Sequence, residues 1–425
     1  MTRHLVVIAE HRVMGEIHRN PAGRLTFIYD ESWRALPNAY PISLSMPLVI
    51  REHEHRRIDP WLWGLLPDNE IILRRWAQRH HVSARNAFAL LSHIGEDCPG
   101  VIQLVRPERV AAILDETDSQ IEWLTEHDVA ERLRLLGRDQ SAWRTSSDTG
   151  QFSLAGAQPK TALLHDGIRW GVPSGAMPTT HILKPPVDAL DGHAVNEHIC
   201  LELARALDMP AADSVVTEFE DQTAIVVKRY DRLQTGNTIR RLHQEDMCQA
   251  TGHAPEEKYQ SEGGPGPADI IELLGSQSGD PETDIWTYTR ALIFNWLIGG
   301  TDAHAKNYSM LIQSGGHARL APLYDIASAY PYDLDSRRMK LAQKIGGRYK
   351  IDEIGRHQWE KFANDAHLPA TAVIGACRDM AEQIPDTLSS VLSKSTPQIS
   401  TLEFSQHLQS VLIDRARRIT ETLSR

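Results

Sequence analysis

The sequence has few of the features that mark secreted, membrane-spanning or DNA-coating proteins. Only four cysteines occur in 425 residues, far apart and without a CxxC pair, so the spacing excludes a disulfide framework or a zinc ribbon. No long apolar run is present, and the longest uncharged stretch, 35–50, contains three prolines. We therefore expect no signal peptide and no membrane span, and a reduced, cytoplasmic protein.

Basic residues are also scarce relative to acidic ones. The 45 Lys and Arg against 56 Asp and Glu give a net charge of -11, which argues against a surface built to neutralise DNA phosphates. Hydrophobic residues make up 41% and charged residues 24%, as in folded globular proteins. The length allows several domains. We expect a strand-rich region over 1–107, a helical connector over 108–144, a second strand-rich region over 145–243 and a mostly helical region over 244–425.

Local patterns give the expected elements within these regions. The segments 5–10 and 16–30 predict a hairpin that turns at 20–23. Further on, apolar side chains recur at helical intervals that Pro67 interrupts, and we expect them to pack in a core. These side chains are Trp61, Leu65, Ile72 and Trp76. Later, 285–300 predicts a buried helix and 261–267 a flexible loop.

The most informative stretch lies directly after that buried helix. Asp302 and Asn307 have the Asp-x-x-x-x-Asn spacing of the protein-kinase catalytic loop, in which the Asp orients the attacking hydroxyl and the Asn holds Mg²⁺. Asp325 follows an apolar strand, where the kinase pattern needs a second carboxylate for the metal. Together the three residues predict one Mg²⁺ site.

The same residues allow two other interpretations. Asp and Asn are common in turns, so each could cap a turn or begin a loop. His304 could instead join Asp302 and Asp325 in the metal site of a phosphohydrolase, because imidazole and carboxylate groups suit transition metals. No second His-rich pair stands nearby. The spacing and the flanking apolar runs favour the kinase interpretation.

Candidate nucleotide-binding residues lie upstream. Lys184 ends a predicted strand, where a kinase needs a lysine for the nucleotide phosphates, and Glu197 on the next predicted helix could orient it by an ion pair. Both residue types are more often simply exposed. The stretch 153–161 is a small-residue loop whose backbone N–H groups could approach phosphates, although Pro159 has no N–H to donate. It matches neither the Walker A pattern nor GxGxxG.

Several longer segments, in order along the chain, resemble the HipA family of serine/threonine kinases, the toxin halves of bacterial toxin–antitoxin modules. They are SLAGAQPKTAL, HILKPP, VNEHICLELARALDM, VVKRYDR, RLHQEDMCQATG, NWLIGGTDAHAKNYSMLI, LAPLYDIASAYPY and LAQKIGG. PISLSMPL and WLWGLLPDN look like the HipA N-terminal subdomain. The resemblance implies an α+β, two-lobed protein-kinase-like fold. It has a β-rich N-terminal subdomain, an ATP-binding region over 145–243 and a mostly helical C-terminal lobe over 244–425.

The resemblance also implies ATP and Mg²⁺ as cofactors and assigns roles to residues. Asp302 matches the catalytic aspartate, Asn307 and Asp325 match the Mg²⁺ ligands, and Lys184 matches the ATP-phosphate lysine. Ser153 matches the serine that such kinases phosphorylate on themselves. The other nucleotide contacts that it implies are the loop residues Ala155, Gly156, Ala157, Gln158 and Lys160, the hinge residues Lys228 and Tyr230, Asp231 as a ribose contact, and His304 and Lys306.

A HipA-type function implies particular partners. The kinase would transfer the γ-phosphate to a protein Ser or Thr and be restrained by a small helix-turn-helix antitoxin of the HipB type. The family target is an aminoacyl-tRNA synthetase, with the glutamyl enzyme the best-known case, but no motif marks the substrate.

The alternative is a corepressor that clamps antitoxin dimers on operator DNA. The complete catalytic set favours the kinase, and we expect DNA contact mainly through the antitoxin, because the basic pairs are scattered. These pairs are Arg74-Arg75, Arg240-Arg241, Arg337-Arg338 and Arg417-Arg418.

Overall fold

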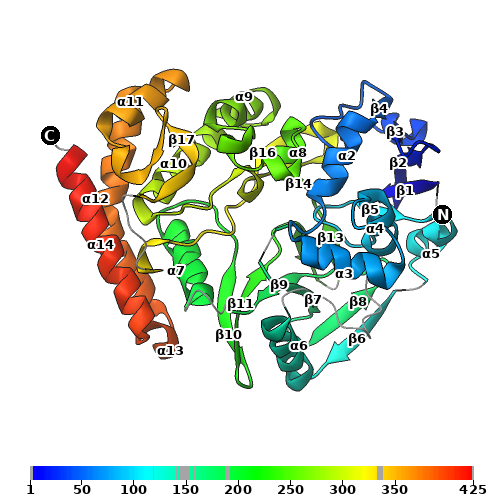
Figure 1. Ribbon diagram of the computed structural model, residues 1–425, viewed down its shortest axis with the longest axis horizontal. Coiled ribbons are helices and arrows are strands. Elements are labelled where there is room, and N and C mark those ends of the chain that lie inside the picture. The colour runs from blue at the N-terminus through cyan, green and yellow to red at the C-terminus, as the bar shows by residue number, and fades with distance from the viewer. Residues whose placement is uncertain are drawn as a thin grey trace. The chain divides into compact units, whose positions relative to one another are not determined.

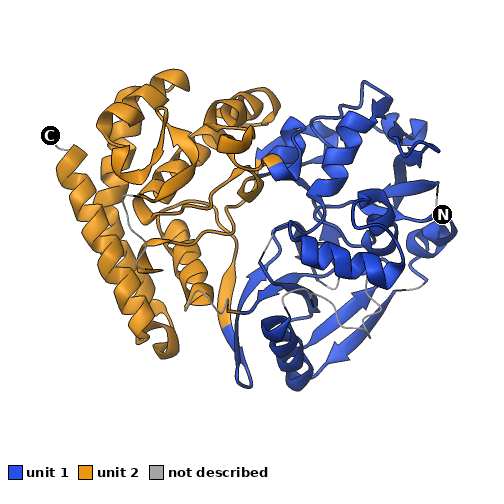
Figure 2. Cartoon of the chain, in the orientation of Figure 1, with its two compact units in different colours: residues 1–185, 217–256, 309–319 blue, residues 186–216, 257–308, 320–425 orange. Residues whose placement is uncertain are grey.

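The computed structural model describes residues 3–117, 119–139, 142, 153–156, 158–186, 192–236, 238–332 and 338–423. The chain divides into two compact units (Figure 2). Unit 1 comprises 1–185, 217–256 and 309–319, and unit 2 comprises 186–216, 257–308 and 320–425. Neither unit is one continuous stretch. The boundaries of the four regions expected from the sequence stay predictions.

Unit 1 begins with a five-stranded antiparallel sheet of order β4-β3-β2-β1-β5 (Figure 1). The predicted hairpin is confirmed: Gly23 N donates to the Asn20 carbonyl at 2.9 Å, and Gly23 has a φ of +84°, which favours glycine. The strands are β1 (His4–Ala9), β2 (Arg12–Arg19), β3 (Leu25–Tyr29), β4 (Glu52–Glu54) and β5 (Gln103–Val105). The helices are α1 (Glu31–Arg34), α2 (His55–Gly64), α3 (Glu70–His80), α4 (Ala87–Ile94) and α5 (Val110–Leu114).

The interruption expected at Pro67 separates α2 from α3. Helix α3 starts afresh because the Asn69 side chain accepts from the Ile71 N–H at 2.9 Å and caps it. The core role predicted for the apolar side chains of this segment is confirmed, since all four are buried. They are Trp61, Leu65, Ile72 and Trp76.

A six-stranded sheet of order β10-β11-β9-β7-β8-β6 forms the second part of unit 1. Helix α6 (Glu126–Arg138) packs on it, with Val129 and Leu133 against Leu163, Leu183 and Val226 (Figure 1). The strands are β6 (Gln120–Leu124), β7 (Thr161–His165), β8 (Trp170–Ser174), β9 (His181–Lys184), β10 (Ser214–Phe219) and β11 (Gln222–Lys228). Strand β10 passes from unit 2 into unit 1.

Part of the segment expected to be a helical connector is instead a strand. Residues of β6 pair with β8 in antiparallel register, from Gln120 opposite Ser174 to Leu124 opposite Trp170. The Arg169 guanidinium lies 3.8 Å from the centre of the Trp123 ring. This cation–π contact further stabilises β6 as the edge strand of the sheet. Pairing with a distant strand therefore overrides the local helical period.

A three-stranded sheet, β14-β15-β16, links the N-terminal part of unit 1 to the rest of it. Glu245 on β14 is buried, and its Oε1 accepts from the Leu44 N–H at 2.7 Å. The Asp246 side chain caps α8 by accepting from the Gln249 N–H at 2.9 Å. The elements here are β12 (Arg232–Thr235), β13 (Thr238–Arg241), β14 (His243–Asp246), β15 (Ser309–Ile312), β16 (Ala318–Leu320) and α8 (Met247–Thr251).

Unit 2 is mostly helical, as predicted, and is built around the buried helix α10. The ring of Trp296 in α10 meets that of Trp359 in α11 at 5.5 Å between centroids. The long helices α12 and α14 pack along each other (Figure 1). The elements are α7 (His193–Ala206), α9 (Pro267–Gln277), α10 (Pro281–Ile298), α11 (Arg356–Asp365), α12 (Ala370–Lys394), α13 (Pro397–Ser400), α14 (Glu403–Leu423), β17 (Lys340–Ile345) and β18 (Arg348–Lys350). Within the described ranges, no helix combines the length and apolar character needed to cross a bilayer.

The buried Glu245 makes the stability of the protein depend on pH. Burial raises its pKa to about 8, so the folded protein keeps a proton that the unfolded chain releases above about pH 4.3. Stability therefore falls as the pH rises through this window. We expect Glu245→Gln, which has the shape of the neutral acid, to gain about 2–5 kcal/mol relative to the wild type between pH 5 and pH 9. Urea unfolding of both proteins at pH 5 and pH 9 measures their free energies of unfolding. A difference between the two proteins that is the same at both pH values would contradict the prediction.

Candidate active site

The loop that follows α10 is fixed around the backbone of Asp302. Its carbonyl oxygen accepts from the Asn307 Nδ2 at 2.8 Å and from the His304 N–H at 2.8 Å. Asn307 and Lys306 are buried, whereas 70% of the Asp302 side chain is exposed. The loop thus presents one carboxylate outward. Since the Asn307 amide nitrogen is engaged, its oxygen is the atom suited to a cation.

Asp325 lies on a segment that is tied to this loop. The Tyr324 hydroxyl donates to the Lys306 carbonyl at 2.7 Å, and the Ala329 N–H donates to the Gly299 carbonyl at 3.0 Å. Asp325 has a φ of +57°, a region that few non-glycine residues occupy. Such backbone conformations cluster at functional sites, because the surrounding contacts must hold them in place.

The small-residue loop of unit 1 packs on the segment between α2 and α3. The Ser153 hydroxyl donates to the Leu65 carbonyl at 2.6 Å, and Ser153 has 0% exposure. Gly156 forms a parallel bridge with Pro67, and its carbonyl accepts from the Asp68 N–H at 3.2 Å. A side chain at Gly156 would collide with the Lys160 ammonium, because a Cβ there would lie 2.6 Å from Nζ.

The remaining nucleotide-binding candidates lie on or next to the six-stranded sheet. Lys184 is buried at the end of β9, opposite Ile225 of β11. Lys228 ends β11 and is exposed. Tyr230 follows it, and its hydroxyl donates to the Gln244 Oε1 at 2.7 Å. These positions fit a strand lysine and a hinge whose backbone is held in place.

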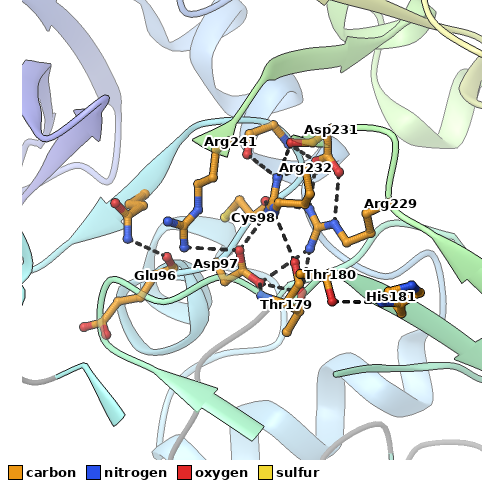
Figure 3. Close-up of polar contacts among 12 residues, drawn as sticks. Glu96, Asp97, Cys98, Thr179, Thr180, His181, Arg229, Asp231, Arg232 and Arg241 are labelled. Atoms are coloured by element: carbon orange, nitrogen blue, oxygen red, sulfur yellow. Dashed lines mark hydrogen bonds and ion pairs between the residues drawn. The ribbon is translucent and has the colours of Figure 1, made fainter. Parts of the chain in front are cut away.

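A buried cluster of charges lies beside this hinge (Figure 3). Asp231 accepts from the Arg229 Nη2 at 2.8 Å and from the Arg232 Nη1 at 2.8 Å. The other carboxylate, Asp97, accepts from the Arg232 Nη2 at 2.8 Å and lies 3.4 Å from the Arg241 Nη2. Two carboxylates thus meet three guanidinium groups, all of them buried.

Asp97 is the central member of the cluster. Its Oδ2 accepts from the Thr179 hydroxyl at 2.7 Å and from the Thr179 N–H at 3.1 Å, and its backbone carbonyl accepts from the Ser153 N–H at 2.9 Å. Burial by itself would raise the pKa of Asp97, but the neighbouring positive charges more than offset this and hold the pKa below its usual range. These charges belong to Arg232, Arg229 and Arg241.

Two family models match the chain. The HipA N-terminal domain model matches residues 5–105, and the HipA-like C-terminal domain model matches residues 152–388. The chain belongs to the HipA family. Known members of this family are similar over nearly the whole length.

A protein of Sinorhizobium fredii named as a kinase, Y4mE, is 34% identical over 91% of this chain and 91% of its own. The serine/threonine-protein kinase toxin HipA of Shewanella oneidensis is 28% identical over 92% of this chain and 89% of its own. The HipA structure from Shewanella oneidensis MR-1, solved with HipB and operator DNA, superposes with a TM-score of 0.86 at 25% identity and covers 99% of this chain and 98% of that one. These matches confirm the predicted HipA family, the two-lobed kinase-like α+β fold and the kinase class.

Within this HipA-family fold, unit 2 brings the segments of Asp302, Asn307 and Asp325 together, and His304 and Lys306 lie on the same loop. Among the described residues, no group of three His, Cys, Asp or Glu side chains is placed to hold a metal. The predicted Mg²⁺ site includes Asn307, a residue type outside that group of four, so the site stays a prediction. Glu197 is buried in α7, and its ion pair with Lys184 stays a prediction. Ala157 lies outside the described residues.

Asp231 belongs to the buried cluster, and the ribose contact predicted for it stays a prediction. Its carboxylate is buried and accepts from the Gly100 N–H at 2.7 Å as well as from two guanidinium groups. A buried charge needs such partners, so we assign Asp231 to the structural cluster. Arg241, one of the scattered basic pairs, joins the same cluster with 9% of its side chain exposed.

Sequence reasoning missed Asp97 and its arginine partners. Asp97 lies in the N-terminal part of unit 1, whereas Arg229 and Arg232 lie more than a hundred positions further along the chain. The pair Glu96-Asp97 within an apolar stretch was the sequence feature that could have indicated a buried charge. A charged residue in such a stretch needs a buried partner, but the neighbouring sequence does not identify that partner.

The cluster makes Asp97 important for stability. We expect Asp97→Asn to lower the free energy of unfolding by about 3–5 kcal/mol, because three buried guanidinium groups would then share one carboxylate. Urea unfolding measures the change. Glu70→Gln is the matched control, since its ion pair with Arg74 is exposed and should matter little. Equal effects of the two substitutions would show that the cluster does not stabilise the fold.

Proposed function

We propose that this chain is an ATP- and Mg²⁺-dependent serine/threonine protein kinase and the toxin of a toxin–antitoxin pair. The observation that carries the proposal is the loop of Asp302. Its carbonyl is held by the Asn307 amide, its carboxylate is presented outward, and the Tyr324 hydroxyl ties it to the Asp325 segment. This arrangement supplies an acceptor for a hydroxyl proton next to oxygen ligands for a hard cation.

Each residue of unit 2 has a definite task in this proposal. Asp302 orients the Ser or Thr hydroxyl of the protein substrate and accepts its proton as the oxygen bonds to the γ-phosphorus and ADP leaves. Asn307 and Asp325 would hold Mg²⁺. The donor set fits, because Mg²⁺ prefers carboxylate and carbonyl oxygens. When bound, the ion neutralises the charge of the phosphates.

Unit 1 would bind the nucleotide. Lys184 at the end of β9 pairs with phosphate oxygens, and the backbone of Lys228 and Tyr230 meets adenine. The loop from Ala155 to Lys160, with Gln158, would cover the phosphates once it leaves the segment on which it now packs. His304 and Lys306 complete the set of proposed nucleotide contacts.

We further propose a HipB-like helix-turn-helix antitoxin as partner, because the similar HipA of Shewanella oneidensis MR-1 was solved with HipB and operator DNA. The chain would reach operator DNA mainly through that antitoxin, since its own net charge is -11. An aminoacyl-tRNA synthetase, the glutamyl enzyme first, is the proposed substrate, and the cytoplasm is the proposed location.

The role of Asp302 is tested by Asp302→Asn, which keeps the shape of the side chain and removes the proton acceptor. We expect phosphotransfer to fall by about 10²-fold or more, with folding and ATP binding nearly unchanged. Transfer of labelled phosphate from ATP in the presence of Mg²⁺ measures the rate, and calorimetry measures ATP affinity. Turnover close to that of the wild type would refute the proposed function.

We propose that Ser153 is an autophosphorylation site that switches the loop off. Its hydroxyl is buried against the Leu65 carbonyl, so the loop must leave that segment before the hydroxyl can react. A phosphate adds about -1.5 to -2 charges and cannot return to a buried carbonyl oxygen. The phosphorylated loop would therefore stay displaced from both the Leu65 segment and the nucleotide.

This switch has a direct test. We expect the phosphorylated wild type to bind ATP at least about tenfold more weakly than the unphosphorylated protein and to be inactive on other proteins. Ser153→Ala should still bind ATP. Mass spectrometry after incubation with Mg²⁺ and ATP gives the extent of modification, and calorimetry gives the affinity. Full modification with unchanged ATP affinity would rule out the switch while leaving the kinase assignment intact.

A further inference from the structure

A tyrosine outside the predicted motifs contacts the carboxylate of Asp302. Tyr259 lies between α8 and α9, and its hydroxyl donates a hydrogen bond to Oδ1 of Asp302. Its ring stands edge-on against the His304 imidazole, with centroids 5.1 Å apart and an interplanar angle of 85°. The His304 Nε2 lies 4.0 Å from the same Oδ1, which is too long for a hydrogen bond.

The segment that carries Tyr259 is fixed in place. The Lys258 carbonyl accepts from the Ala305 N–H at 3.1 Å, which joins the segment directly to the catalytic loop. The Tyr259 carbonyl accepts from the Glu262 N–H at 2.9 Å and from the Gly264 N–H at 3.2 Å. The neighbouring Gln260 side chain accepts from the Lys344 N–H at 2.7 Å. These hydrogen bonds fix the backbone of Tyr259 so that its side chain reaches Asp302.

The glycines that follow explain why the chain can make this turn. A Cβ on Gly264 would lie 1.7 Å from the Glu257 carbonyl oxygen, and a Cβ on Gly266 would lie 2.1 Å from the Gln260 Nε2. Within residues 261–267, predicted as a flexible loop, 261–263 are exposed and 264–267 are buried, and a short 3₁₀ segment covers Gln260–Glu262. Glycine is present at Gly264 and Gly266 because a side chain there would collide with these neighbours.

The contact matters because the Asp302 side chain is mostly exposed. Asn307 and His304 fix its backbone, but 70% of the side chain is exposed. A carboxylate that must meet an incoming hydroxyl needs one oxygen held so that the other points to the substrate. With Oδ1 bound to Tyr259, Oδ2 becomes the oxygen for the substrate hydroxyl.

We propose that Tyr259 is a positioning residue that orients the carboxylate of Asp302 for protein phosphorylation. This inference rests on the proposed function, because it takes Asp302 as the proton acceptor. Tyr259 acts through Asp302 and does not itself touch the phosphoryl group. The effect of losing its hydroxyl therefore appears in turnover and not in nucleotide binding.

The variant Tyr259→Phe removes the hydroxyl and keeps the ring. We expect kcat for phosphotransfer to protein to fall about 5- to 20-fold, because a hydrogen bond to a charged group is lost at a half-exposed site. KM for ATP and the thermal midpoint of unfolding should stay at wild-type values. Tyr349→Phe, on β18 of the same unit, is the matched control and should leave kcat unchanged.

A double-mutant cycle separates this inference from the proposed function. If Tyr259 acts through Asp302, Tyr259→Phe should cause no further loss in the Asp302→Asn background. A multiplicative loss in that background, an unchanged kcat in Tyr259→Phe alone, or a faster variant would each overturn the positioning role. The faster variant would mean that the phenol blocks the place of the substrate hydroxyl. Near wild-type activity of Asp302→Asn alone would instead refute the proposed function.

Discussion

The contacts of Asp97 hold together the parts of unit 1 that we propose bind the nucleotide. Its carboxylate is the partner of Arg229, which lies within the hinge, and of Arg232, which follows it. Its backbone carbonyl accepts from the Ser153 N–H. Separating these buried charges would leave guanidinium groups without a counter-ion in a medium that solvates them poorly. The region around Asp97 therefore cannot move away from the hinge by itself. The HipA N-terminal domain is in this way joined to the part of unit 1 that we propose binds the nucleotide.

In unit 2, the packing of aromatic rings holds the segment before Asp302 in place. Helix α10 ends at Gly299, whose φ is +70°, and a Cβ there would lie 2.6 Å from the Tyr330 ring. The Arg415 guanidinium of α14 lies 5.7 Å from the Trp296 ring centre and 5.9 Å from that of Tyr330. The C-terminal helix thus packs near the start of the proposed catalytic loop. The exposed side chain of Asp302 therefore follows a segment whose backbone is closely packed.

Local signals explain which parts of the molecule could be predicted. The break at Pro67 and the spacing of Asp302 and Asn307 are properties of a few neighbouring residues. The structure confirms the break, and it joins the Asn307 amide to the Asp302 carbonyl. Strand β6 could not be predicted, because its partner β8 is remote in sequence and its own residues have a helical period. The burial of Asp231 could not be predicted for the same reason: its partner Gly100 belongs to the N-terminal domain. Buried charges are specified by long-range partners, so one sequence marks them only as charged.

The small residues near Ser153 have the composition of a phosphate-binding loop. In the structure, the same small residues also let the loop pack on the segment between α2 and α3. The smallness that lets backbone groups approach phosphates also lets Gly156 pair with Pro67 and accept from the Asp68 N–H. The contact with Asp68 uses the Gly156 carbonyl, whereas phosphates would take backbone N–H groups. What opposes the proposed switch is the burial of the Ser153 hydroxyl against the Leu65 carbonyl, which must be given up before that hydroxyl can react. On the proposed function, the loop must therefore hold the Leu65 segment weakly enough to be released, a demand that the composition of the loop alone does not reveal.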